Sequence, residues 1–176
     1  MWQLPTHGEV SEQIHYKDYP AEHRAGHTLL SALNEGSPIR QQGNIFHGYT
    51  SWRIEWRFRW WEESDGRCRI TENQTRLRAE ITLPKLATKD SDAMAAFTHY
   101  LSALRAHELT HVKIARDYAG RIDRGILNLP EMKSCRTLED AANRLGHQLL
   151  QQATSEEKEM DKLTAHGRTQ GAFLAR

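Results

Sequence analysis

The sequence predicts an α+β domain in which a small twisted antiparallel sheet packs on two long helices. Two observations lead to this prediction. Residues 45–84 show the apolar and polar alternation of strands, whereas residues 90–167 carry apolar stripes with the three- and four-residue spacing of helices. Strands grouped ahead of helices, with no linker between the blocks, are typical of α+β domains. A chain of 176 residues fits one such domain, spanning residues 1–176.

The first block should hold one short strand and one short helix. We expect the strand over Ile14–Tyr19 and the helix over Glu22–Leu33. The helix should stop within the segment 34–38, Asn-Glu-Gly-Ser-Pro, because glycine followed by proline is a helix stop signal.

The second block contains the strands of the sheet. Trp52, Ile54, Trp56, Phe58 and Trp60 alternate with Arg53, Glu55, Arg57 and Arg59. Interleaved arginine and tryptophan would also suit a stacking surface for single-stranded nucleic acid. The alternation, however, places aromatic and charged side chains on opposite faces, which favours a strand that covers a core. After a turn at residues 64–66, a second strand region runs over Cys68–Leu83, with a bulge or break at residues 72–75 and an end at Pro84.

The third block should form the two long helices. The first is expected from about Asp90 to Leu127, with Asp90 or Ser91 as its N-cap. The second should begin near Thr137, where Thr137 and Asp140 approximate a capping box. Gly167 suits a left-handed cap at its end.

The most specific motif, His107-Glu108-Leu109-Thr110-His111, lies inside the first long helix. Positions i and i+4 share one helix face, so two imidazoles at this spacing can hold one Zn²⁺ while the glutamate acts as general base. Composition alone gives about 0.05 such strings per chain, so the context decides. Glu108 and His111 fall about 20° and 40° from the centre of the apolar stripe. Because an unpaired buried glutamate is costly, a metal site is favoured over surface residues.

Catalytic zinc normally has three protein ligands and one open position, so a third ligand is required. The H-x-x-G-x-x-H continuation is absent, and the end of the second helix offers Asp161 and His166. On an extrapolated helix, His166 lies about 60° from the stripe of Leu145 and Leu163, and Asp161 about 160° from Leu163. We therefore expect His166 as the third ligand, with Asp161 orienting a ligand imidazole. The reverse assignment makes Asp161 the ligand and leaves His166 to stabilise an oxyanion.

These parts predict a zinc-dependent endopeptidase that acts on a peptide or protein substrate. Glu108 would take a proton from a metal-activated water and deliver it to the leaving amine. Tyr118 and His147 are candidate donors to the tetrahedral oxyanion. The strand Leu77–Leu83 is expected to present its edge to an extended peptide. Two alternatives stay open, namely a zinc amidase or hydrolase on cell-wall peptide, and a non-enzymatic exported binding module whose zinc is structural or lost.

Composition excludes several classes of protein. A net charge of +1 argues against a dedicated nucleic-acid binder, and the absence of an eighteen-residue apolar run argues against a membrane span. Residues 1–5 lack the features of a signal peptide, so the residues themselves fit a cytosolic protein or a mature exported one. Cys68 and Cys135 are the only cysteines and fit a disulfide and two reduced thiols equally well. No pattern specifies an oligomeric state.

Taken together, the motifs resemble a bacterial domain-of-unknown-function family of predicted secreted zinc-dependent proteases. The H-E-x-x-H motif is followed at a distance by Asp161-Lys162-Leu163-Thr164-Ala165-His166-Gly167 and then Gln170-Gly171-Ala172. Further matches are Tyr16 and Tyr19, Gly48-Tyr49-Thr50-Ser51-Trp52, Cys68, and Ile81-Thr82-Leu83-Pro84, so the likeness covers about residues 12–173. The resemblance implies a zincin-like metallopeptidase fold, a periplasmic or secreted location, and a disulfide between Cys68 and Cys135.

Overall fold

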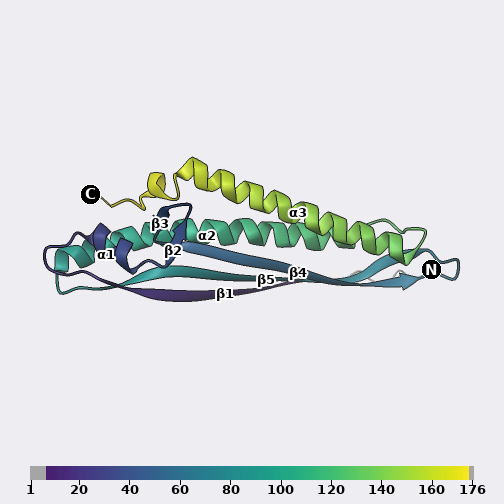
Figure 1. Cartoon of the computed structure of the whole chain (residues 1–176). Coiled ribbons are helices and arrows are strands. Elements are labelled where there is room, and N and C mark those ends of the chain that lie inside the picture. Colours follow the sequence, from purple (N-terminus) through teal and green to yellow (C-terminus); the bar gives the residue numbers. More distant parts are fainter. Residues whose placement is uncertain (1–6, 175–176) are drawn as a thin grey trace. The chain divides into compact units, whose positions relative to one another are not determined.

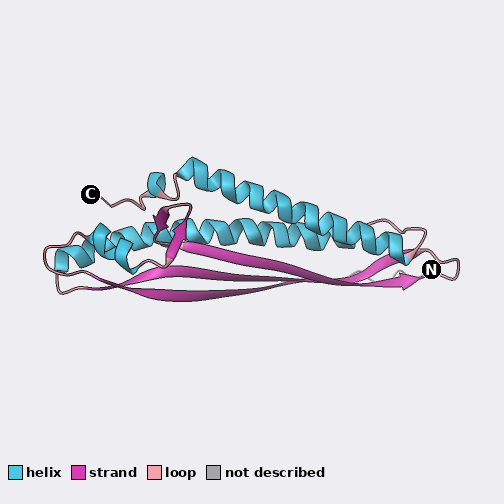
Figure 2. Cartoon of the chain, in the orientation of Figure 1, coloured by secondary structure: helices cyan, strands magenta, loops and turns pink. Residues whose placement is uncertain are grey.

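The computed structural model describes residues 7–174, and the expected α+β class is confirmed. Residues 1–6, which include the segment 1–5 expected to lack signal-peptide features, lie outside the described part, as do residues 175–176. The elements, shown in Figures 1 and 2, are β1 (His7–Glu22), α1 (Leu29–Gly36), β2 (Ile39–Gln41), β3 (Asn44–Phe46), β4 (Tyr49–Glu62), β5 (Cys68–Ala87), α2 (Ser91–Leu127), α3 (Cys135–Thr164) and the 3₁₀ turn η1 (Arg168–Gln170).

The described chain divides into two compact units. Residues 7–13, 52–78 and 113–156 form one unit, here called the disulfide unit, and residues 14–51, 79–112 and 157–174 form the other, here called the motif unit. Five elements, β1, β4, β5, α2 and α3, contribute residues to both units. The single domain expected over residues 1–176 stays a prediction.

The main sheet has the strand order β1-β5-β4 and is mixed rather than antiparallel. In the motif unit β1 and β5 end side by side, because the His23 N–H that follows β1 donates to the carbonyl of Ala87 at 2.9 Å. In the disulfide unit β4 and β5 are joined by a hairpin closed by a hydrogen bond from Glu63 N to Arg67 O at 2.7 Å. The expected antiparallel sheet is wrong. Strand β5 lies between the other two, and it runs antiparallel to β4 but parallel to β1.

Strand β5 is the central strand, and its burial pattern explains its position. Leu77, Ala79, Ile81 and Leu83 are all buried, with the two-residue period of a strand that covers a core. Because β5 is paired on both sides, Leu77–Leu83 offers no free edge to a peptide, which corrects that expectation.

Two irregularities interrupt the alternation of β5. Buried positions change from even numbers at Cys68 and Ile70 to odd numbers from Asn73 onward, as a bulge near residues 72–75 would produce. Pro84 does not end the strand, which continues to Ala87. The buried positions shift again there, from Leu83 to Pro84, and a residue without an N–H is tolerated at such irregularities.

Helix α1 begins later than expected. Glu22 is the last residue of β1, and the helix starts only at Leu29 because Thr28 is its N-cap, with Oγ1 accepting the Ser31 N–H at 3.1 Å. The expected stop is confirmed, since the helix ends at Gly36.

A hairpin that the sequence did not predict follows α1. Its strands β2 and β3 are antiparallel and pair Ile39 with Phe46 and Gln41 with Asn44. The two turn residues, Gln42 and Gly43, both have positive φ (50° and 80°), as a tight two-residue hairpin turn requires.

The long helices begin at side-chain caps. Asp90 caps α2, since its Oδ1 accepts the N–H groups of Asp92 and Ala93 at 2.9 and 3.0 Å, so both expected bounds of this helix are confirmed within a residue. Helix α3 begins at Cys135, two residues earlier than expected. Its cap is Ser134, whose Oγ accepts the Thr137 N–H at 3.2 Å, so the expected capping box at Thr137 is wrong because Thr137 is already helical.

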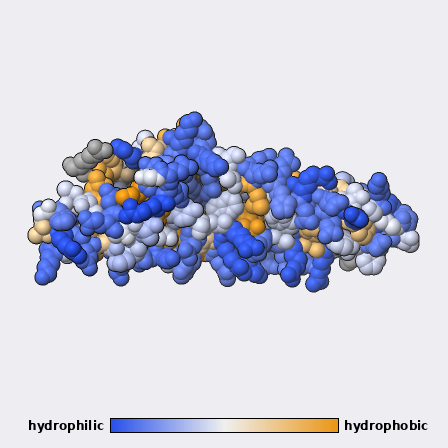
Figure 3. All heavy atoms as spheres, viewed as in Figure 1, coloured by the Kyte–Doolittle hydropathy of each residue, from blue (hydrophilic) through white to orange (hydrophobic). Residues whose placement is uncertain are grey.

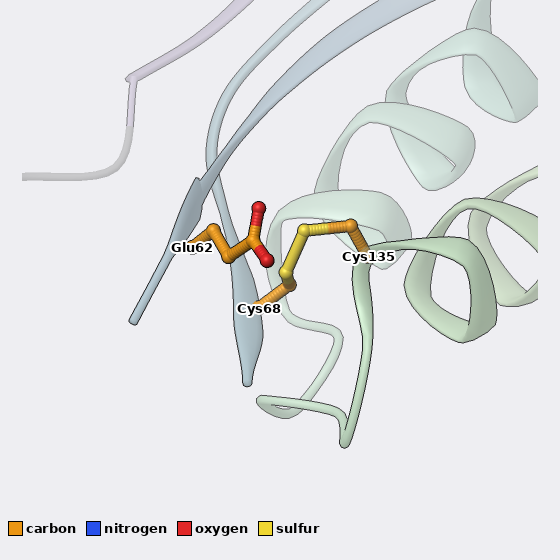
Figure 4. A group of neighbouring side chains, drawn as sticks. All are labelled: Glu62, Cys68 and Cys135. Carbon is orange, nitrogen blue, oxygen red and sulfur yellow. A yellow bond between two sulfur atoms is a disulfide. The ribbon is translucent and has the colours of Figure 1, made fainter. Parts of the chain in front are cut away.

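The implied disulfide is present in the disulfide unit and joins the first residue of β5 to the first residue of α3 (Figure 4). The Cα atoms of Cys68 and Cys135 are 5.0 Å apart, and Cys68 also forms a two-way backbone bridge with Met132. The Glu62 carboxylate lies beside the sulfurs, within 4.8 Å. Because both sulfurs are bonded to each other, this group has no thiolate to offer a metal.

A second feature of the disulfide unit is a buried polar cluster of Asn73, Thr75 and Asp123. Asp123 Oδ1 accepts hydrogen bonds from Asn73 Nδ2 at 2.7 Å and from Thr75 Oγ1 at 3.1 Å. A Cβ at Gly8 would lie 2.5 Å from Asp123 Oδ2, so glycine leaves the space that the carboxylate occupies.

The surface is mostly polar. Hydrophilic residues cover most of the face drawn in Figure 3, in agreement with a mean hydropathy of −0.75. Within residues 7–174, no helix combines the length and the apolar character that a bilayer crossing requires.

Candidate metal centre

Helix α2 holds the two motif histidines with one nitrogen of each ring fixed by an acceptor. His107 and His111 are 3% and 8% exposed, with ring centroids 5.1 Å apart. His107 Nδ1 lies 2.9 Å from Gln170 Oε1, and His111 Nδ1 lies 3.0 Å from Glu157 Oε1. Both partners are oxygen acceptors, so each Nδ1 carries a proton. The Nε2 atoms are therefore left to take either a proton or a metal ion.

The third group at this point is Asp161 of α3. Its Oδ1 lies 3.2 Å from His107 Nε2 and 3.1 Å from His111 Nε2, and the three ligand atoms lie within 4.8 Å of one another. Oδ1 is buried without a hydrogen-bond partner among the described residues. Ligand atoms of a tetrahedral zinc are about 3.3 Å apart, and two histidines with one carboxylate form a known catalytic donor set. These residues therefore fit a zinc ion.

The electrostatics of the site favour positive charge. Burial alone would lower the pKa of His111, but the carboxylates of Asp161 and Glu157 outweigh it and raise that pKa to about 10. The pKa of His107 is raised in the same way, with Asp161 and Gln170 outweighing burial. Burial would raise the pKa of Asp161, but the two imidazoles lower it well below its usual value. A site that holds extra protons this strongly also suits a cation that replaces them.

Glu108 is held beside the histidines with one oxygen engaged. It is 3% exposed, and its Oε2 accepts a hydrogen bond from Thr50 Oγ1 at 2.7 Å. Burial raises the pKa of Glu108, against the lowering effect of the Thr50 hydrogen bond. A Cβ at Gly48 would lie 2.5 Å from Oε1, so glycine leaves room for the carboxylate. A buried carboxylate with a raised pKa and one oxygen without a hydrogen bond is suited to act as a base.

The chain turns sharply after α3, and this turn decides the position of His166. Ala165, His166 and Gly167 all have positive φ, at 48°, 53° and 83°. Thr164 Oγ1 accepts the Gly167 N–H at 3.2 Å, and a Cβ at Gly167 would lie 3.0 Å from His107 Cγ. The His166 side chain is 52% exposed, with Nδ1 3.7 Å from Asp161 Oδ2. The structure thus brings Asp161 to the two motif histidines, and His166 lies beyond it.

The two expected oxyanion donors belong to the disulfide unit. The Tyr118 hydroxyl donates to Glu156 Oε2 at 2.9 Å. The His147 ring packs edge-on against Trp56 at a centroid distance of 5.3 Å. Neither residue lines the cavity at the metal centre.

That cavity has a volume of about 710 Å³ and is formed by the motif unit. Its wall includes Glu108 and the three residues that fit a metal, together with residues of the β2–β3 hairpin and of the segment that follows α3. The candidate base and the candidate ligands therefore face one shared space that is large enough for part of a peptide.

Residues 16–167 match a bacterial family described as "bacterial protein of unknown function (DUF922)". The chain belongs to this family. The DUF922 match spans the H-E-x-x-H motif and ends at Gly167, the last residue of the segment Asp161–Gly167 that follows this motif at a distance. Neither a curated protein nor a solved structure matches the chain.

Four contributors to the site were not assigned a role from the sequence. Gly48 and Thr50 belong to a segment of the DUF922 match, and Gln170 follows it, but nothing in the sequence shows which atoms they contact. Glu157 had a detectable signal, because it precedes Asp161 by four residues and so shares its helix face.

A buried hydrogen-bonded chain at the cavity was also unforeseen. His47 Nδ1 lies 2.7 Å from the Tyr100 hydroxyl, and His47 Nε2 lies 2.9 Å from Asn34 Oδ1. Tyr19 donates to the His47 carbonyl at 2.9 Å. Burial lowers the pKa of His47 to about 4 and raises the pKa of Tyr19 to about 12, so both groups are neutral at pH 7.

Proposed function

We propose that the protein is a zinc-dependent endopeptidase. The observation that carries the proposal is the convergence of His107 Nε2, His111 Nε2 and the unpartnered Asp161 Oδ1 beside a buried glutamate. Three acceptor atoms at such distances repel one another unless a proton or a cation lies between them. The H-E-x-x-H spacing adds the general base that a structural zinc site would not need.

Each residue has a distinct role in this proposal. His107, His111 and Asp161 would hold the zinc, and Gln170 and Glu157 would keep the two imidazoles in the orientation that presents Nε2. Zinc bound there would supply Lewis acidity, lowering the pKa of water and polarising the substrate carbonyl.

Glu108 would move the proton. The Thr50 hydroxyl fixes Oε2, so Oε1 is the atom that accepts the proton and later gives it to the leaving amine. The raised pKa brings this carboxyl closer to the working pH and strengthens it as a base. His166, half exposed at the cavity, remains the candidate to stabilise the oxyanion.

The disulfide supports a place outside the cytoplasm. Disulfides persist in oxidising compartments and are rare in the cytosol. The bond between Cys68 and Cys135 therefore favours a periplasmic or secreted protein.

The decisive experiment compares the wild type with Glu108→Gln. We expect wild type purified without added metal to contain about one zinc per chain and to cleave an unstructured protein such as casein. Glu108→Gln should keep the zinc and lose activity by about 10²–10⁴-fold, because the amide cannot accept the proton.

A control variant and two contrary outcomes complete this experiment. Glu159→Gln makes the same change at an exposed position of the same unit and should leave activity unaltered. Full activity of Glu108→Gln would contradict the mechanism, and zinc-loaded wild type that cleaves no peptide would contradict the function.

A further inference from the structure

Exposed apolar side chains gather around the cavity of the metal centre. Ile45, Tyr49 and Phe173 line it although they are 37%, 45% and 54% exposed, and half-buried Phe46 and Leu30 adjoin them. In a chain with a mean hydropathy of −0.75, such a group at a concave site is a typical mark of ligand binding.

The charges of the cavity restrict what this apolar wall can accept. Among the described residues, Glu108 and Asp161 are the only acidic ones that line it; Thr50 engages Oε2 of Glu108, and the motif histidines engage Asp161. Within residues 7–174, Arg168 carries the one permanent positive charge of the lining, and it forms no ion pair there. In this described lining, a basic side chain would therefore meet a cation and find only Glu108 Oε1, the atom that the proposed reaction uses.

The hairpin beside the wall offers partners to a peptide backbone. All three residues of β3 line the cavity, whereas β2 contributes only Gln41. In the described part of the chain, β3 pairs with β2 alone and so keeps one edge unpaired. An extended peptide can add to such an edge and place alternate side chains against the wall.

We propose that this wall is a substrate subsite for one large apolar side chain of an extended peptide, and that it rejects lysine and arginine. The inference rests on the proposed peptidase function, and it names the class of substrate. The selective contacts come from Ile45 on the hairpin and Phe173 in the segment after α3. Phe173 is itself supported by Arg168, whose guanidinium carbon lies 5.1 Å from the ring centroid.

Binding is the first test, and it uses zinc-loaded Glu108→Gln so that no peptide is consumed. Isothermal titration compares acetyl-Ala-Ala-X-Ala-Ala-amide peptides in which X is leucine, serine or lysine. Burying one leucine side chain should make that peptide bind about tenfold or more tightly than the serine peptide, and lysine should bind most weakly.

Variants of the wall locate the effect. Ile45→Ser and Phe173→Ser, each in the Glu108→Gln background, should reduce the leucine preference to about threefold or less without changing the zinc content. Leu163→Ser is the matched control, because Leu163 is 71% exposed in the same unit but does not line the cavity. If Ile45→Ser does not fold, the Phe173→Ser variant, which changes an exposed residue, still tests whether the leucine preference depends on the wall.

The outcomes separate the subsite from the peptidase function. Equal binding of the three peptides, no binding of any, or an undiminished leucine preference in Phe173→Ser would overturn the subsite. Cleavage of many peptides by wild type without apolar preference would also overturn the subsite while retaining the peptidase. A leucine preference in binding, with no cleavage by wild type, would retain the subsite and reject the peptidase.

Discussion

Helix α2 contributes to two buried polar clusters, and the two differ in which groups contact the carboxylate of each cluster. In the disulfide unit, Asp123 Oδ1 receives hydrogen bonds from Asn73 and Thr75. In the motif unit, Asp161 Oδ1 faces two imidazole nitrogens at ion-pair distance and receives no hydrogen bond. In the first cluster, neutral donors satisfy the carboxylate oxygen, although Asn73 Oδ1 has no hydrogen-bond partner among the described residues. The Asp161 oxygen instead faces two imidazole nitrogens, which requires a proton or a cation beside it. Burial of a carboxylate alone therefore does not indicate a metal site, and it is the nature of the neighbours of Asp161 that supports the proposed zinc.

Removing one carboxylate charge from each cluster should give opposite results. Asp161→Asn should weaken zinc binding on the order of 10³-fold or more, since losing even an outer partner of a ligand costs about 10–100-fold. Asp123→Asn should leave zinc binding unchanged and lower the free energy of unfolding by about 1–3 kcal/mol, because its hydrogen bonds lose a charged acceptor. Competition with a zinc-sensitive dye and chemical denaturation measure the two effects. Equal zinc affinity in both variants would contradict the assignment of zinc binding to Asp161 and not to Asp123.

The two units should also differ in what stabilises them. Replacing Cys68 and Cys135 together by serine should lower the free energy of unfolding by about 4 kcal/mol, because the bond closes a loop between residues 67 positions apart. Zinc should bind the double variant as it binds wild type, since the three proposed zinc ligands belong to the motif unit. Urea unfolding of both proteins, with and without a chelator, measures both statements. A loss of zinc from the serine variant under native conditions would show that the two sites are coupled.

His47 predicts a pH dependence for the motif unit. Its folded pKa of about 4 lies below the ordinary value of 6.5, so the unfolded chain binds more protons between these values. The free energy of unfolding should therefore fall as the pH is lowered from 6.5 through 4, by roughly 3 kcal/mol at most. His111 does not contribute in this window, because its raised pKa stabilises the metal-free protein below pH 6.5 and that stability is lost as the pH rises through about 10.

The measurement for His47 uses metal-free protein, so that release of zinc at low pH adds nothing. Unfolding of wild type and of His47→Gln is followed between pH 4 and 7. We expect the variant to show a flatter profile, because glutamine can replace the hydrogen bonds but not the titration. Parallel profiles would assign the pH dependence to other groups.

The smallest effect on zinc affinity is expected for residues that hydrogen-bond to the proposed zinc ligands. Gln170→Ala should lower zinc affinity by about 10–100-fold, because His107 Nδ1 loses the acceptor that orients the ring. Gln152→Ala is the matched change in the disulfide unit, where the Gln152 amide oxygen accepts from Arg121. It should leave zinc affinity unaltered, and a similar loss in both variants would point to a general effect on folding.

The choice between Asp161 and His166 as the third ligand could not be made correctly from the sequence. The angular estimate that favoured His166 used Leu163 as a core residue, but Leu163 is 71% exposed. Asp161, which lies on the opposite side of the helix, therefore faces the motif histidines. The estimate also extended the helix to residue 166, whereas α3 ends at Thr164 and three left-handed residues follow. Neither the exposure of one leucine nor this turn can be derived from periodicity.

Elements with strong local signals were predicted well, and elements set by tertiary pairing were not. The start of α2 follows from its cap and its end from Leu129-Pro130, and the stop of α1 follows from its glycine. The strand order was not predictable, because the alternation of β4 and β5 is the same whether β1 lies beside β4 or beside β5. Helix α1 starts late because Gly26 has a positive φ of 81° and Thr28 is the N-cap.

The spacing of acids on α3 mirrors that of the histidines on α2. Glu157 and Asp161 are four residues apart, as are His107 and His111, and Glu157 and Asp161 serve His111 from its two ring nitrogens. A slip of α3 by one turn would carry Glu157 to the place of Asp161, and the outer support of His111 would then fall to Ala153. The slipped arrangement keeps a carboxylate at the zinc site but loses the outer support of His111, so zinc affinity depends on the register of the two helices. A metal-sensitive dye added during refolding would report the fraction of chains in which the two helices have aligned correctly.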